Sequence, residues 1–339
     1  MKNMKKRSLR RIFAGILGIG ILLTGAAPCA AAAYGYDEYG DPIVTATPVP
    51  DGQSSGQAAA VTPAHSSYYS QAADTDSIDG WPKGPSIEAQ AAVLMDVNTE
   101  AVLYSKNADT QLYPASITKI LTTLLACENL NAKTNITVSE NASTSVTAGD
   151  SSIYAAPGEE FTRDQALMAV MLQSANEMSV AVAEQVSGSV KKFTELMNWR
   201  AKLFGCKNTH FNNPNGLPDE NHYTCVYDMY LIFSNAVKND TFVSIIGTTS
   251  YDVTYTDASG EAVTHTWENT NQYLTGNATT PDGFQIVGGK TGTTGEAGYC
   301  LVLYSYNPSG QPIISIVFKA DGKSNLYLLM NEMLQGFAI

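Results

Sequence analysis

An apolar helical pattern with a proline directly before it, at residues 115–126, constrains this chain more than any other segment. Pro114 disfavours helical structure at Tyr113, so the helix is expected to begin just after the proline. Apolar side chains then recur at the i, i+3, i+4, i+7 and i+8 spacing of one helix face: Ile117, Ile120, Leu121, Leu124 and Leu125. This face predicts a helix that packs into the core of a folded domain.

Two polar residues in the first turn of this helix, Ser116 and Lys119, have the chemistry of a nucleophile and its base. Their spacing of three puts them on neighbouring helix positions. A serine hydroxyl is a poor nucleophile unless a base takes its proton, and a desolvated lysine can be that base. A simpler interpretation is a serine near a helix start with a solvated lysine, since Ser189 and Lys192 have the same spacing.

Two later patterns bear on this choice. Ser174 and Asn176 place a hydroxyl and an amide two residues apart, although Ser174 and Glu177 would also fit a helix capping box. The run Lys290–Gly292 occurs once and lies among further glycines, where a plain glycine-rich hairpin is the alternative. In this order, Ser-x-x-Lys, Ser-x-Asn and Lys-Thr-Gly form the motif set of penicillin-binding proteins and β-lactamases.

On these motifs the chain resembles the serine-type D-Ala-D-Ala carboxypeptidases, the low-molecular-mass penicillin-binding proteins, over about residues 86–339. Further segments that look like this family occur in chain order at 114–119, 174–177, 211–218, 222–224, 269–271 and 289–298. The resemblance implies an enzyme that removes the terminal D-alanine from peptidoglycan stem peptides through an acyl-serine intermediate. It also implies that β-lactams act as covalent inhibitors.

The resemblance implies a role for each catalytic residue. Ser116 attacks the carbonyl between the two D-alanines, and Lys119 takes its proton. Ser174 passes a proton to the leaving amine, while Asn176 orients the substrate amide and Lys119.

The resemblance also implies a substrate-binding strand. Lys290 supplies positive potential near the substrate carboxylate, and Thr291 offers that carboxylate a hydroxyl. Gly292 lets the substrate backbone approach, and the N–H groups of Thr293 and Ser116 form the oxyanion hole. No metal or organic cofactor is implied.

The order of the expected elements predicts an α+β fold. Strand patterns come first, helical patterns follow, and the chain returns to strands and a last helix. The expected strands are 91–96, 101–104, 136–138, 251–256, 262–266, 284–287, 298–304 and 312–318. The expected helices are 166–172, 178–186, 190–204, 227–237 and 325–334, besides that at 115–126. We expect a mainly antiparallel sheet flanked by helices with a helical insertion, as in β-lactamases and transpeptidases.

The N-terminal quarter, residues 1–85, carries expectations of its own. A basic stretch, a short apolar run and an Ala-x-Ala site predict a secretory signal peptide at residues 1–33. Residues 34–85 are rich in Ala, Ser, Pro and Asp and predict a disordered acidic linker. Without residues 1–33, 14 basic residues would face 32 acidic ones, a net charge of −18. Such a chain is not built for nucleic acid or anionic lipid. We expect a protein secreted to the cell envelope, with membrane contact only through the signal peptide.

Two departures from the family pattern stand out. The chain ends at Ile339, just after the expected last helix, so neither a second β-rich domain nor a C-terminal anchor is expected. Residues 321–325 read Asp-Gly-Lys-Ser-Asn where the family often carries an arginine near the carboxylate pocket. Carboxylate binding is therefore expected to be weaker or differently arranged.

Three other functions remain open. A β-lactamase would need a deacylation carboxylate, but the candidate stretch 128–131 has the wrong spacing by one residue. A non-catalytic penicillin-binding or wall-sensing protein could use the same fold. An endopeptidase would use the same residues. The four cysteines after residue 33 fit buried thiols, with a Cys206–Cys225 bridge left open, and no residues show metal-ligand spacing.

Overall fold

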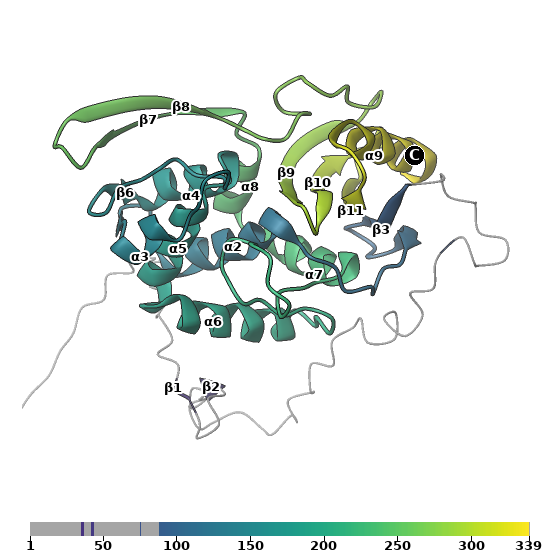
Figure 1. The fold of residues 1–339 in the computed structure, drawn as a ribbon. Coiled ribbons are helices and arrows are strands. Elements are labelled where there is room, and N and C mark those ends of the chain that lie inside the picture. The colour runs from purple at the N-terminus through teal and green to yellow at the C-terminus, as the bar shows by residue number, and fades with distance from the viewer. Residues whose placement is uncertain (1–34, 37–41, 44–74, 76–87, 339) are drawn as a thin grey trace, which may run out of the picture. The chain divides into compact units, whose positions relative to one another are not determined.

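A computed structural model describes residues 35–36, 42–43, 75 and 88–338 (Figure 1). The expected signal peptide (1–33) and most of the expected linker (34–85) lie outside the described residues. Within the linker, β1 (Gly35–Tyr36) and β2 (Pro42–Ile43) pair antiparallel. No helix in the described ranges has the length and apolar character needed to cross a bilayer.

A five-stranded antiparallel sheet in the order β4-β3-β11-β10-β9 forms the framework of residues 88–338 (Figure 1). Its strands are β3 (Ala89–Asp96), β4 (Val102–Lys106), β9 (Gln285–Thr294), β10 (Gly298–Tyr306) and β11 (Pro312–Ala320). The early strand β3 pairs with the late strand β11, so the helices between β4 and β9 form an insertion. This confirms the predicted α+β class.

Both faces of this sheet are covered. Val93 and Met95 pack into the larger core with the inserted helices, whereas Ala92 and Leu94 face a second core. This alternation is the period of two that a strand imposes on its side chains. The second core is closed by α9 (Lys323–Phe337), which crosses the opposite face of the sheet (Figure 1).

The insertion surrounds α2 (Lys119–Asn129), whose apolar face is fully buried as predicted. Its first turn differs from expectation, because residues Ala115–Thr118 form a 3₁₀ helix, η2, that carries Ser116. The other helices of the insertion pack against α2, apart from α3 (Glu140–Thr144), which packs against α5; they are α4 (Arg163–Leu172), α5 (Asn176–Ser187), α6 (Val190–Leu203), α7 (Val226–Ala236) and α8 (Asp240–Ile246). Two small two-stranded sheets complete the insertion: β5 (Asn135–Thr137) with β6 (Glu160–Thr162), and β7 (Ser250–Thr256) with β8 (Ala262–Glu268).

The structure adds helices that were not expected and decides two local alternatives. No helix was expected at α3, which Ser139 caps, or at α8. A capping box from Ser174 to Glu177 does not form, since α5 is preceded by Ala175 without a side-chain cap. The four described cysteines are free thiols, so Cys206 and Cys225 are not bridged.

Candidate active site

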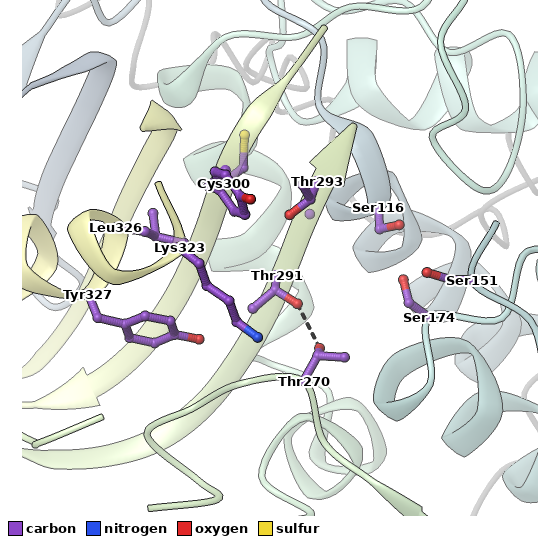
Figure 2. Close-up of a pocket in the computed structure, with 12 residues that line it drawn as sticks. Ser116, Ser151, Ser174, Thr270, Thr291, Thr293, Cys300, Lys323, Leu326 and Tyr327 are labelled. Atoms are coloured by element: carbon purple, nitrogen blue, oxygen red, sulfur yellow. Dashed lines mark hydrogen bonds between the residues drawn. The ribbon is translucent and has the colours of Figure 1, made fainter. Parts of the chain in front are cut away.

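The sequence-predicted site residues meet where η2, the turn between α4 and α5, and strand β9 come together (Figure 2). Five of them, Ser116, Ser174, Thr291, Gly292 and Thr293, border a cavity of about 240 Å³. Its lining comprises Ser116, Ser151, Ser174, Thr270, Thr291, Gly292, Thr293, Tyr299, Cys300, Lys323, Leu326 and Tyr327.

Strand β9 lies directly against the turn that carries Ser116. A Cβ atom at Gly292 would lie 3.0 Å from both a side-chain carbon of Ile117 and the carbonyl oxygen of Pro114. A side chain at this position would therefore push the strand away from η2. Glycine allows the close approach that brings Thr291 and Thr293 to the cavity beside Ser116.

Lys119 is the centre of the hydrogen-bond network. Its side chain is fully buried, and its Nζ lies 3.1 Å from Ser116 Oγ, 2.7 Å from Asn176 Oδ1 and 2.6 Å from the carbonyl oxygen of Asn215. The two carbonyl oxygens can only accept hydrogen bonds, whereas the serine hydroxyl can also donate one. A neutral amine would satisfy all three by donating to the carbonyls and accepting from Ser116.

The environment favours this neutral form. Burial lowers the pKa of Lys119 well below its ordinary value, and the positive charge of Lys290 lowers it further. The negative charges of Glu177 and Asp150 act in the opposite direction but less strongly. Lys119 therefore has the electronic character of a general base for Ser116.

Ser174 and Lys290 form a second hydrogen-bonded pair at the cavity. Lys290 Nζ donates to Ser174 Oγ at 3.1 Å and to the carbonyl oxygen of Thr291 at 2.9 Å. Burial lowers the pKa of Lys290 to about 7. Ser174 has a backbone φ of 58°, a left-handed conformation that costs a non-glycine residue roughly 1–2 kcal/mol. This strained turn directs its hydroxyl into the cavity (Figure 2).

The loop 211–218 contributes directly to the site, which the motif analysis did not anticipate. It supplies the Asn215 carbonyl to Lys119, and Gly216 lies against the backbone just before Ser116. A Cβ at Gly216 would overlap the carbonyl group of Ala115 and approach Ser116 N to 3.0 Å. Ala115 itself has a φ of 49°. The turn bearing Ser116 is thus clamped from the other side by this loop.

His222 holds the same loop in place. Its Nδ1 accepts a hydrogen bond from Asn212 N at 3.0 Å, and its Nε2 lies 2.8 Å from Thr118 Oγ1. Burial lowers the pKa of His222 to about 3, so the ring is neutral and Nε2 carries the hydrogen. The segment 222–224 belonged to the family-like stretches, but its contact to the catalytic turn was not predictable from spacing.

Glu177, on α5, holds the loop at residues 151–155, whose Ser151 lines the cavity together with Ser116. The residue is fully buried, and its Oε1 accepts hydrogen bonds from Ile153 N at 2.7 Å and Ala155 N at 3.4 Å. In addition, Asn176 N donates to the carbonyl oxygen of Ser151 at 2.9 Å. Glu177 therefore does not form a capping box with Ser174 but supports the wall of the cavity.

The segment that lacks the family's arginine still places a cation at the cavity, because Lys323 lines it. Lys323, the first residue of α9, extends toward the hydroxyls of Thr270 and Thr291, which lie 2.6 Å apart (Figure 2). Its amine therefore lies where it could meet a carboxylate beside Thr291. The expectation of a weaker or differently arranged carboxylate pocket stays a prediction.

The residues considered for other chemistries lie elsewhere. Glu128, in the stretch considered for a β-lactamase carboxylate, is at the far end of α2 and forms an ion pair with Arg200. Among the described residues, no cluster of His, Cys, Asp and Glu could hold a metal ion. The geometry instead provides a nucleophile, a buried base and hydroxyl groups, which suit acyl transfer.

Comparison with known proteins supports the same chemistry. Residues 80–322 match the family model described as D-alanyl-D-alanine carboxypeptidase, peptidase family S11. The chain is 39% identical to the D-alanyl-D-alanine carboxypeptidase DacF of Bacillus subtilis, over 73% of this chain and 61% of that protein. It is 32% identical to a Streptomyces D-alanyl-D-alanine carboxypeptidase, over 75% of this chain and 89% of that protein.

The solved structures agree. The crystal structure of a Streptomyces DD-transpeptidase superimposes with a TM-score of 0.70 at 30% identity, over 76% of this chain and all of that one. These similarities confirm the resemblance seen in the motifs. Since the family match covers most of its length, this chain belongs to the D-alanyl-D-alanine carboxypeptidase family.

Proposed function

We propose that this protein is a serine D-Ala-D-Ala carboxypeptidase that trims peptidoglycan stem peptides outside the cytoplasm. The observation that carries the proposal is the buried Lys119, whose Nζ contacts Ser116 Oγ and two carbonyl oxygens. The chain spans 61% of the length of its Bacillus relative, so the activity is proposed from the site. We also propose residues 1–33 as an export signal, 34–85 as a linker and 86–339 as the catalytic domain.

The reaction follows from this arrangement. Ser116 Oγ forms a bond to the penultimate D-Ala carbonyl carbon as its proton passes to Lys119. The N–H groups of Ser116 and Thr293 hold the oxyanion. The C–N bond then breaks as Ser174 delivers its proton to the leaving D-alanine amine, and the proton held by Lys119 replaces it on Ser174. Water then cleaves the acyl ester: its oxygen bonds to the acyl carbon, the bond from that carbon to Ser116 Oγ breaks, and a proton of the water returns to Ser116 Oγ as the shortened peptide leaves. Asn176 holds Lys119 in place throughout.

The decisive experiment follows D-alanine release from diacetyl-Lys-D-Ala-D-Ala beside intact mass after incubation with benzylpenicillin. A carboxypeptidase releases D-alanine and keeps a long-lived penicilloyl adduct. An adduct without release of D-alanine would instead identify a penicillin-binding sensor, and rapid loss of the adduct would identify a β-lactamase. Folded protein that forms no adduct would contradict the assigned site.

Replacing Lys323 with methionine is expected to weaken recognition of the substrate carboxylate. The loss of this exposed cation should lower kcat/KM for diacetyl-Lys-D-Ala-D-Ala by about three- to tenfold, chiefly through KM. Lys323→Arg should retain most activity, because it keeps the charge. Equal losses on the same peptide with a C-terminal amide would show that Lys323 does not read the carboxylate.

The pH dependence of kcat/KM should report the protonation state of the Lys290 amine. Its pKa of about 7 means that the amine is charged below that pH and neutral above it. Because a neutral amine no longer attracts the substrate carboxylate, kcat/KM should fall as pH rises through about 7. Lys290→Arg should remove this falling limb, since arginine stays protonated. The measurement is kcat/KM between pH 5 and 9; a limb that persists unchanged in the arginine variant would exclude Lys290 as its source.

A further inference from the structure

A second cavity, of about 270 Å³, also borders Ser116. It shares Ser116, Ser151 and Thr293 with the first cavity but continues along other residues. These are Gly149, Asp150, Asn176, Asn215, Gly216, Leu217, Pro218, Thr294 and Gly295. A substrate with its reacting carbonyl at Ser116 therefore extends into both cavities. Lys323 and Thr291 line the first, where the carboxylate of the leaving D-alanine belongs, so the acyl part of the substrate occupies the second.

The two cavities carry opposite charges. Asp150 is the one charged side chain among the described residues that line the second cavity, whereas Lys323 lines the first. The rest of the second lining is neutral, and Leu217 and Pro218 offer apolar surface. An acidic group next to a short apolar wall suits an amine carried on a methylene chain.

Asp150 is held in position with one oxygen available. Its Oδ2 accepts hydrogen bonds from Thr147 N at 2.7 Å and from Thr147 Oγ1 at 2.9 Å. Within the described part of the chain, Oδ1 has no hydrogen-bond partner. The neighbouring Ser151 carbonyl is fixed by Asn176 N at 2.9 Å, so the loop has a set position relative to the catalytic residues.

This carboxylate works against the catalytic base. The charge of Asp150 raises the pKa of Lys119, whereas proton abstraction requires the neutral amine. Proton abstraction by Lys119 therefore does not explain why a carboxylate lies at position 150. A bound cation would offset the charge and favour the neutral base at the moment when substrate is present.

We propose that Asp150 binds a cationic amine on the acyl-donor part of the substrate, namely the side-chain amine of a diamino acid that precedes D-Ala-D-Ala. The inference rests on the proposed function and names the class of stem peptide that the site prefers. Asp150 is thus a specificity-determining residue of the second cavity.

The test compares two peptides that differ in one charge, Nα-acetyl-Lys-D-Ala-D-Ala with a free side-chain amine and its Nε-acetylated form. The wild-type protein should prefer the free amine by about three- to fivefold in kcat/KM, and added salt should reduce this preference. Asp150→Asn should bring the ratio close to one, and Asp150→Glu should restore part of it. Asp109→Asn, the same change at an exposed position, should keep the wild-type ratio.

The outcomes separate this inference from the proposed function. Release of D-alanine from both peptides at equal rates by the wild type would overturn the role of Asp150 and leave the carboxypeptidase assignment intact. An unchanged preference in Asp150→Asn, with penicillin labelling and melting temperature showing a folded site, would also overturn it. Failure to release D-alanine from either peptide would instead count against the proposed function.

Discussion

Alanine at position 116 is expected to abolish the penicilloyl adduct and to reduce D-alanine release by at least about 10⁴-fold. Ser116 Oγ lies 3.1 Å from Lys119 Nζ and borders both cavities, so its removal deletes the bond-forming atom. The substitution leaves the surrounding core intact, because Ile117 and Lys119 keep their buried positions. Intact mass spectrometry with benzylpenicillin and a D-alanine assay measure both effects, with the melting temperature as a check on folding.

The matched control is Ser189→Ala, in the other Ser-x-x-Lys sequence. Ser189 caps α6 by accepting a hydrogen bond from Lys192 N at 3.3 Å. Its loss should cost about 1 kcal/mol of stability at most and should leave labelling by penicillin unchanged. An adduct that survives in Ser116→Ala, or disappears in Ser189→Ala, would contradict the assignment of the nucleophile.

Alanine at Gly216 should disable the site without touching a reacting group. The new Cβ would overlap the Ala115 carbonyl, and the φ of 91° is unfavourable for a residue with a side chain. Relief of this overlap must move either the turn bearing Ser116 or the loop that offers the Asn215 carbonyl to Lys119. We expect a loss of about 2–4 kcal/mol in stability and at least about 100-fold slower acylation by penicillin.

Gly336→Ala provides the comparison for this change. Gly336 lies in α9 without a positive φ, and a Cβ there would meet no atom within 4 Å. The substitution should stabilise the protein by roughly 0.5–1 kcal/mol, because alanine is the better helix former. Stopped-flow acylation and thermal unfolding measure both variants. Wild-type acylation by folded Gly216→Ala would show that the contact with Ala115 does not position the nucleophile.

The sequence by itself determined the local features of this protein. The spacing of Ile117, Ile120 and Leu124 predicted a buried helix, since a period of 3.6 residues puts these side chains on one face. The order of the expected strands and helices along the chain predicted the α+β class, and the structure confirmed it. The motifs at Ser116, Ser174 and Lys290 also identified the family, because each is a short run of residues that can be recognised from residue types and spacing alone.

Only the tertiary structure decided which groups surround the reacting atoms. The Asn215 carbonyl reaches Lys119, and Gly216 supports the turn at Ser116. Lys323 lines the first cavity beside Thr291. Each of these contacts joins residues that lie far apart in the sequence. Periodicity and spacing report only on neighbours along a helix or strand, so they carry no information about such contacts. The burial of Lys119 is likewise decided by the tertiary structure. The sequence alone predicts an ordinary charged lysine, whereas the core packed around the side chain lowers its pKa.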